Sequence, residues 1–198
     1  MNDDERAIRD PRGRRHKRGY LPHFDALGFT QFVTFRLADS LPVKLFEKLK
    51  FELELRQITE IEYHRKIERA LDIGDGPTYL KDPKIASMVA ETLLKFDGQK
   101  YTMHAWVIMP NHVHLLFSPS DNFSLSEIMH SIKSFTAKKA NEILSRSGRF
   151  WSPDYFDRFI RDRDHFTNAK KYIENNPVKA GLCEAPEEWW WGSAGFSG

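Results

Sequence analysis

The stretch from Trp106 to Phe117, WVIMPNHVHLLF, places the strongest constraint on the fold of this chain. It consists of two apolar segments separated by Pro110 and Asn111, a pair of residues that favours a turn. Two apolar segments joined by a short turn predict an antiparallel hairpin. We therefore expect strands over about 101–108 and 112–117.

Two histidines, His112 and His114, lie two residues apart in the second of these strands. Because side chains alternate across a strand, both imidazoles lie on the same face, while Val113 points into the core. Two imidazoles on a rigid element can bind one metal ion if a neighbouring element completes the shell. The pattern is short, and two polar positions on a half-buried strand explain it equally well.

Length and composition favour one domain with a proper core, because the chain has 198 residues of which 40% are hydrophobic. The single cysteine, Cys183, excludes a disulfide framework and a multi-thiolate zinc site within one chain. This fits the reducing cytoplasm, where we expect the protein. No uncharged apolar run approaches membrane-spanning length, and the N-terminus lacks the apolar core of a signal peptide, so we expect no membrane partner.

The basic residues are distributed unevenly, and we predict two parts: a basic flexible arm over residues 1–19 and one domain over residues 20–198. The arm has almost no apolar side chains, and it would bind the phosphates of a nucleic acid. The alternative is a solvated tail that only aids solubility. The arm residues that would contact phosphate are Arg12, Arg14, Arg15, Lys17 and Arg18.

The first half of the domain begins with a strand over about 30–37, which is rich in β-branched and aromatic residues. A long helix follows, from near Pro42 to about Leu71, and we expect a break near Thr59. Asp82 and Pro83 then start a second helix, as cap and first helical residue.

The second half contains a third helix from Ser124 to about Ser145, where Glu127 completes a capping-box pattern. A last strand lies in the later half of 150–160. We expect Asp164 to cap a fourth helix that Pro177 ends. The third helix carries Lys133, Lys138 and Lys139, and Arg161 follows the last strand. Their side chains would contact a phosphate backbone; the alternative is a solvated surface.

The order of elements predicts an α+β domain with the ferredoxin-like split β-α-β layout, an antiparallel sheet with helices packed mainly on one face. The His-x-His strand is then central and close to the last helix. Tyr172 and Asn176 lie one turn apart on that helix. An ion bound by His112 and His114 would be within reach of Asn176, with Tyr172 beside it.

The C-terminal tail contains Trp189, Trp190 and Trp191. We expect these side chains to pack back onto the domain. The alternative is an aromatic platform on which nucleic-acid bases stack.

Four blocks of the sequence resemble the REP-associated tyrosine transposases, within the single-tyrosine HUH transposase family. They are Ala105–Leu116 with the HVH motif, His130–Lys138, YFDRFIRD over Tyr155–Asp162, and YIENNPVKAGL over Tyr172–Leu182. The resemblance runs from about Gly19 to Ala194 with the blocks in the family's order. The helical stretch over about 52–72 is longer than in compact members, and no site residue is carried over there.

The resemblance implies a metal-dependent endonuclease and transposase that cleaves and rejoins single-stranded DNA at hairpin-forming repeats through a 5′-phosphotyrosine. His112 and His114 match the metal ligands, Tyr172 the nucleophile and Asn176 the third ligand, a place that glutamine holds in related transposases. Tyr155 is the competing tyrosine, for which we expect packing or a role on the face of the strand. The ion would be Mg²⁺ or Mn²⁺.

The implied partner is single-stranded or hairpin DNA, and we expect a monomer, with a dimer as the alternative. Two other functions stay open at this point. One is a catalytically inactive, domesticated protein that binds DNA hairpins. The other is an unrelated metal hydrolase that activates water with the histidines.

Overall fold

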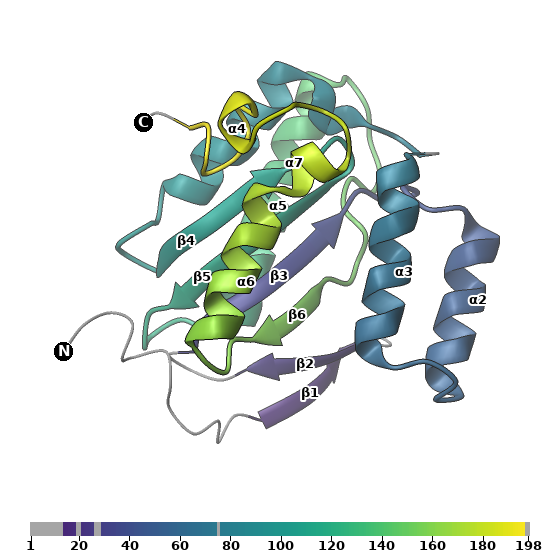
Figure 1. The fold of residues 1–198 in the computed structure, drawn as a ribbon. Helices are drawn as coiled ribbons and strands as arrows, with labels where there is room; N and C mark the ends of the chain where they lie inside the picture. The colour runs from purple at the N-terminus through teal and green to yellow at the C-terminus, as the bar shows by residue number, and fades with distance from the viewer. Residues whose placement is uncertain (1–13, 19–20, 26–28, 75, 197–198) are drawn as a thin grey trace.

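The computed structural model describes residues 14–18, 21–25, 29–74 and 76–196. Its centre is an antiparallel sheet in the order β4-β5-β3-β6 (Figure 1). The strands are β3 Gln31–Arg36, β4 Tyr101–Ile108, β5 His112–Pro119 and β6 Phe156–Phe159. The predicted hairpin is confirmed, since β4 pairs with β5 antiparallel, and β5 occupies a central position.

Alternation along the strands divides the core into two layers. Val33, Phe35 and Val113 point to one face, which α4 (Pro83–Leu94) and α5 (Leu125–Ile143) cover. The other face carries Phe32 and Leu116 and is covered by α6 (Arg163–Glu174). Figure 1 shows α6 in front of the sheet and α4 and α5 behind it. The predicted ferredoxin-like α+β fold is confirmed, and α6 adds a layer on the second face.

The predicted break in the long helix is also present. The stretch forms α2 (Val43–Glu54) and α3 (Glu60–Ile73), which pack against each other through Leu49, Tyr63 and Ile67. Thr59 starts α3 with a capping box, because its hydroxyl accepts from the Glu62 amide at 3.2 Å and the Glu62 carboxylate accepts from the Thr59 amide at 2.8 Å. The break therefore separates two helices beside the sheet, and the second of them has its own N-terminal cap.

The starts of α4 and α5 agree with the sequence analysis. Asp82 caps α4, with Pro83 at its first position, and Ser124 and Glu127 form the predicted capping box of α5. A short 3₁₀ helix at Tyr79–Lys81 precedes α4. Both caps satisfy amide groups that have no partner within the helix.

The predicted bounds of the last helix are wrong at both ends. Asp162, not Asp164, caps α6, and its Oδ1 accepts from the His165 amide at 2.7 Å. The helix ends at Glu174, and Asn176 begins a separate short helix, α7 (Asn176–Lys179). Pro177 lies in the first turn of α7, where its missing N–H is not needed, so it starts a helix and does not end one.

The C-terminal tail packs back onto the edge strand β4, as predicted. After a 3₁₀ turn at Pro186–Glu188, the Trp191 carbonyl accepts from the Ile108 amide at 2.8 Å, and the Trp189 indole donates to the Ile108 carbonyl at 3.1 Å. These contacts cover backbone groups that would otherwise leave the sheet edge open. Trp190 remains 56% exposed.

The N-terminal segment contributes a second, two-stranded sheet. Strand β1 (Arg14–Arg18) pairs antiparallel with β2 (Leu21–Asp25). Arg12 and the rest of residues 1–13 lie outside the described residues. The division into a basic arm and one domain stays a prediction. No helix in the described part of the chain is long and apolar enough to cross a membrane.

Candidate metal and tyrosine site

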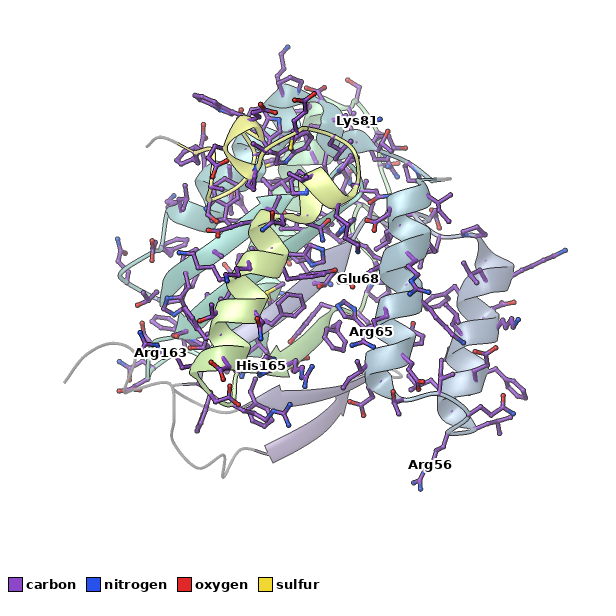
Figure 2. The ribbon with its side chains drawn as sticks, viewed as in Figure 1. Arg56, Arg65, Glu68, Lys81, Arg163 and His165 are labelled. Atoms are coloured by element: carbon purple, nitrogen blue, oxygen red, sulfur yellow. The ribbon has the colours of Figure 1, made fainter. Side chains whose placement is uncertain are left out.

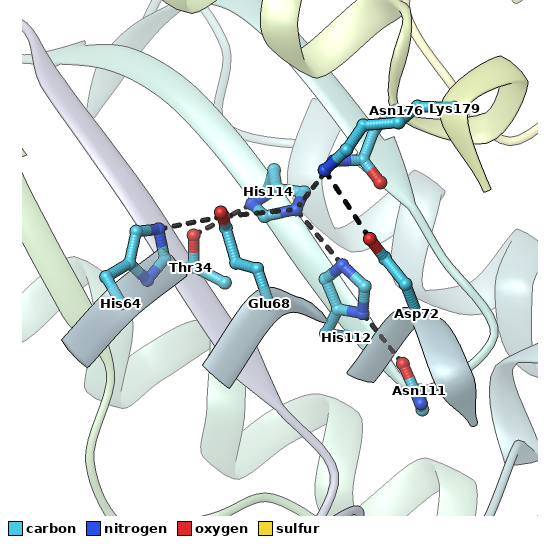
Figure 3. Close-up of polar contacts among 9 residues, drawn as sticks. All are labelled: Thr34, His64, Glu68, Asp72, Asn111, His112, His114, Asn176 and Lys179. Atoms are coloured by element: carbon cyan, nitrogen blue, oxygen red, sulfur yellow. Dashed lines mark hydrogen bonds and ion pairs between the residues drawn. The ribbon is translucent and has the colours of Figure 1, made fainter. Parts of the chain in front are cut away.

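The two histidines of β5 converge on one point beneath α6 and α7. His112 and His114 are 1% and 0% exposed, and their Nε2 atoms lie 3.0 Å apart (Figure 3). Two atoms that each lie about 2.1 Å from an octahedral ion are about 3.0 Å apart when they are neighbours. The spacing of the two nitrogens therefore suits two adjacent ligands of one divalent ion.

The proton of His112 is placed by Asn111. The Asn111 Nδ2 donates to the Leu71 carbonyl at 2.8 Å, which leaves its Oδ1 facing the His112 Nδ1 at 2.7 Å. An amide oxygen can only accept, so the Nδ1 of His112 carries the hydrogen. The Nε2 of His112 is consequently unprotonated, which is the form that binds a metal.

His114 is held in a similar way from the neighbouring strand. Its Nδ1 lies 2.8 Å from the hydroxyl of Thr34, the residue directly opposite on β3. The Asn176 amide, at the start of α7, places its Nδ2 3.2 Å from the His114 Nε2. A flip of the Asn176 side-chain amide would exchange its two terminal atoms and bring Oδ1 next to the His114 Nε2. In the present orientation Oδ1 is buried without a hydrogen-bond partner.

Burial keeps both imidazoles neutral. It lowers the pKa of His112 well below its usual value, and the neighbouring His114 adds to this effect. Burial also lowers the pKa of His114 to about 4, although the Glu68 carboxylate opposes the change. Neutral imidazole is the metal-binding form, so the pair is ready for an ion without losing protons at pH 7.

Tyr172 lies beside the histidines of its own chain. Its ring centroid is 5.6 Å from that of His114, and the Lys179 ammonium lies 5.6 Å from the centre of the Tyr172 ring. The hydroxyl is buried and makes no hydrogen bond. Burial raises the pKa of Tyr172, and the charge of the nearby Glu68 raises it further. The metal-free protein therefore holds this side chain as a neutral phenol.

Helix α3 brings two further residues to the site, and sequence reasoning missed both. The buried Glu68 places Oε1 2.8 Å from the Nε2 of His64 and 3.9 Å from the Nε2 of His114. Burial alone would raise the pKa of Glu68, but His64 and then His114 hold it down at about 2. The available signal was the spacing of His64 and Glu68 by four residues on one helix face.

The donor set fits a divalent ion, because it offers two neutral imidazoles and an amide oxygen near one point. Among the described residues, no three histidine, cysteine or acidic side chains already form a metal-binding group. A third ligand would be an amide oxygen, such as Oδ1 of Asn176, or a side chain that turns toward the histidines.

The structure does not bring Tyr155 to the histidines. It precedes β6 and packs against the core on the α5 side, with the Lys133 ammonium 5.5 Å from its ring centre. Lys133 also donates to the Pro153 carbonyl at 2.7 Å. These contacts agree with the packing role expected for Tyr155.

The other predicted DNA-binding residues lie in two places. Lys138 and Lys139 are exposed on α5, across the sheet from the histidines, and Lys139 pairs with Glu142 at 2.9 Å. Arg161 is exposed just before α6, on the side of Tyr172. The side chains of Arg14, Arg15, Lys17 and Arg18 are not among those described. The DNA-contacting role of all these residues stays a prediction.

The sequence analysis gave no DNA-contacting role to two arginines near Arg161, which are Arg158 and Arg65. Burial lowers the pKa of Arg158 on β6, and the charges of Arg161 and of Arg65 on α3 lower it further. Figure 2 shows Arg65 on α3 and His165 at the start of α6, on either side of β6. Positive charge thus gathers over the sheet edge formed by β6.

The fold and this site resemble those of IS200-like transposases. Residues 80–176 match the family model described as "Transposase IS200 like", a range that contains the histidine pair, Tyr172 and Asn176.

Relatives narrow the assignment. A "Putative REP-associated tyrosine transposase" from Haemophilus influenzae is 29% identical over 93 residues, 41% of this chain and 52% of that protein. A "REP-associated tyrosine transposase" from Escherichia coli is 24% identical over 104 residues, 52% of this chain and 60% of that protein. The matches thus span between half and two thirds of the length of these two relatives.

A solved structure shares the fold: that of a REP-associated tyrosine transposase bound to a REP hairpin. Its TM-score is 0.52 at 17% identity, over 90% of this chain and 81% of the other. Together the comparisons confirm the resemblance found in the motifs. The chain is similar to the REP-associated tyrosine transposases.

Proposed function

We propose that this protein is a metal-dependent endonuclease and transposase that cuts and rejoins single-stranded DNA at hairpin-forming repeats. One observation carries the proposal. Tyr172 and the pair of neutral imidazoles, His112 and His114, converge on one buried point within a single chain. The relatives named as tyrosine transposases support the same activity.

His112, His114 and Asn176 would hold Mg²⁺ or Mn²⁺. When bound, the ion would neutralise charge on a non-bridging phosphate oxygen and orient the scissile bond for attack. Imidazole ligands suit Mn²⁺ better, whereas Mg²⁺ prefers oxygen ligands. The buried amide oxygen of Asn176, which has no partner, is the oxygen ligand that the site offers first.

Tyr172 would supply the nucleophile. Its phenolic oxygen forms a bond to phosphorus, the bond to the 3′ oxygen breaks, and the products are a 5′-phosphotyrosine and a free 3′-hydroxyl. The phenolic proton has to leave during attack, because the buried hydroxyl is protonated in the free protein. The phosphoester keeps the energy of the broken bond, so rejoining needs no nucleotide cofactor, and the chain has no Walker-type phosphate loop.

DNA would approach over the edge formed by β6. Arg65, Arg158 and Arg161 give this edge a positive charge. Phosphate contacts of this kind hold a strand in register without reading its sequence. The REP hairpin bound by the structurally similar protein supports a hairpin as the class of substrate here.

We expect a monomer in the cytoplasm. The tyrosine helix α6 packs on its own sheet, and Tyr172 reaches the histidines of its own chain, so the site needs no second copy.

Covalent capture tests the activity. The protein is mixed with an end-labelled single-stranded hairpin from repeat DNA flanking its gene, in Mn²⁺ or in EDTA, and covalent protein–DNA product is resolved on a denaturing gel. We expect product from the wild type in Mn²⁺ and none from Tyr172→Phe. Tyr155→Phe is the matched control and should retain capture.

The two other functions give different results in the same assay. An inactive hairpin-binding protein would retain the hairpin without forming any covalent product. A metal hydrolase would cut the strand without a covalent intermediate and would tolerate Tyr172→Phe. Either pattern would overturn the proposal.

A further inference from the structure

Among the described residues, Glu68 is the anionic side chain closest to the paired histidines, and it comes from outside the matched family region. It lies on α3, twelve positions before residue 80, where the family match begins. Its side chain is 8% exposed and reaches the histidines from the side opposite to Asn176, as Figure 3 shows. No role for this residue follows from the family motifs.

The distances suit a shared coordination shell. The Glu68 Oε1 lies 3.9 Å from the Nε2 of His114. Ligand atoms of an octahedral ion are about 3.0 Å apart when adjacent and about 4.2 Å apart when opposite. The carboxylate is thus within reach of an ion bound by the histidines, once its side chain turns from His64 toward them.

Buried polar atoms gather at the same place. The Oδ1 of Asn176 is buried without a hydrogen-bond partner, and the hydroxyl of Tyr172 is buried beside the Glu68 carboxylate. The Oε1 of Glu68 has His64 as its ion-pair partner, in a short contact that lacks hydrogen-bond geometry. A buried oxygen without a partner costs free energy, and a divalent cation would satisfy the Asn176 oxygen while sharing the Glu68 carboxylate.

His64 restrains the position of Glu68. The imidazole stacks flat on Phe156 of β6, with ring centroids 3.8 Å apart and an interplanar angle of 4°. Its Nε2 lies 2.8 Å from the Oε1 of Glu68 and holds the carboxylate near the histidine pair when no ion is bound. The stack ties α3 to the sheet edge and keeps Glu68 within reach of β5.

We propose that Glu68 is a fourth, anionic ligand of the metal site formed by His112, His114 and Asn176, and that His64 is its positioning residue. The inference rests on the proposed function, because it concerns the same ion. Two imidazoles and an amide carry no charge, so the ion would otherwise keep its full charge in a buried site. One carboxylate lowers that charge while leaving a net positive centre for a phosphate oxygen.

Calorimetric titration with Mn²⁺ alone tests the ligand. The proteins are the full-length wild type, Glu68→Gln and Glu68→Ala, each freed of metal with EDTA, dialysed and checked for folding by thermal unfolding. We expect Glu68→Gln and Glu68→Ala to bind Mn²⁺ at least tenfold more weakly than the wild type. Unchanged affinity in a folded Glu68→Gln protein, or a wild type that binds no Mn²⁺, would overturn the inference.

Asp72 provides the matched control. It lies four residues further along α3, is half-buried and pairs with Lys179 at 3.5 Å, so Asp72→Asn removes a nearby negative charge without removing a ligand. We expect less than a threefold loss of Mn²⁺ affinity for Asp72→Asn. An equal loss in both variants would show that charge near the site matters and ligation by Glu68 does not.

A second measurement needs no variant. In crystals of the wild type grown with Mn²⁺, the anomalous peak should lie about 2.2 Å from a Glu68 carboxylate oxygen. A peak bound by the histidines with Glu68 still at His64 would overturn the inference, even if covalent capture in Mn²⁺ succeeds. Loss of capture in the wild type, with Mn²⁺ bound by Glu68, would instead overturn only the proposed function.

Discussion

Asn111 and His112 form a hydrogen bond of 2.7 Å between neighbouring side chains, in which His112 Nδ1 donates to the amide oxygen of Asn111. Because Asn111 is itself fixed by the Leu71 carbonyl at 2.8 Å, the bond sets the tautomer of His112. Removing such an outer partner of a metal-binding histidine weakens metal binding by about 10–100-fold. We expect Asn111→Ala to lower Mn²⁺ affinity by this factor, measured by calorimetry.

Asn175→Ala is the control for that variant, since Asn175 is an exposed asparagine whose side-chain amide donates to the Lys171 carbonyl at 2.9 Å. It should leave Mn²⁺ affinity unchanged. Equal affinities for the wild type and Asn111→Ala would mean that the tautomer of His112 is set by something else.

Thr34 has the same relationship to His114, with its hydroxyl 2.8 Å from Nδ1. Thr34→Val keeps the shape and the strand preference of the side chain but removes the acceptor, so the imidazole is free to place its hydrogen on Nε2. We expect an Mn²⁺ affinity about tenfold lower for Thr34→Val. Thr34→Ser restores the hydroxyl and should recover most of the Mn²⁺ affinity. If Thr34→Ser binds Mn²⁺ as weakly as Thr34→Val, the loss comes from packing and not from the hydrogen bond.

Local signals in the sequence predicted much of this arrangement. Strand alternation puts both histidines on one face whatever the rest of the fold does, and a capping box such as that of Ser124 and Glu127 needs only residues three apart. The placement of α6 over β5 followed from the order of the elements. The start of α6 was missed because Asp162 and Asp164 are both acceptable caps, and only the backbone decides between them.

The contribution of α3 was not predictable in the same way. Glu68 lies more than forty residues before His112, in a helix with many other acidic residues, and its pattern is that of a solvated helix face. Only the packing of α3 along the edge of the sheet buries this one carboxylate. Asn111 was interpreted as a turn residue, and its second role depends on the Leu71 carbonyl, which α3 also supplies.

Tyr172→Phe should remove the nucleophile without destabilising the fold. The buried hydroxyl makes no hydrogen bond, so its removal deletes a polar group that has lost water without gaining a partner. We expect the variant to be as stable as the wild type or more stable by up to about 1 kcal/mol in urea unfolding in EDTA. A loss of more than about 1 kcal/mol would show that the hydroxyl has a partner in the folded protein.

Trp189 and Trp190 allow a matched test of the tail. Trp189 packs on the α6 side of the sheet and donates to the Ile108 carbonyl at 3.1 Å, whereas Trp190 is 56% exposed. We expect Trp189→Ala to cost about 2–4 kcal/mol of unfolding free energy and Trp190→Ala less than about 0.5 kcal/mol. If Trp190→Ala instead weakens binding of single-stranded DNA with unchanged stability, the exposed ring serves as a platform for bases.

The pH dependence of stability should report on Lys133. Burial lowers the pKa of Lys133 to about 8, although Asp154 opposes the change. Between about pH 8 and pH 10.4, the usual value for lysine, the unfolded chain still holds this proton and the folded protein has lost it. The free energy of unfolding therefore gains a contribution that rises with pH, by at most about 1.4 kcal/mol per unit.

Lys133→Met removes this contribution, so the wild type should gain stability relative to the variant as the pH rises from 8 to 10. The measurement is urea unfolding of both proteins at several pH values in that window. Lys138→Met, on an exposed position of the same helix, is the control and should follow the wild type. Parallel curves for the wild type and Lys133→Met would mean that Lys133 keeps its charge in the folded protein, and hence that its ammonium is solvated and available to a phosphate.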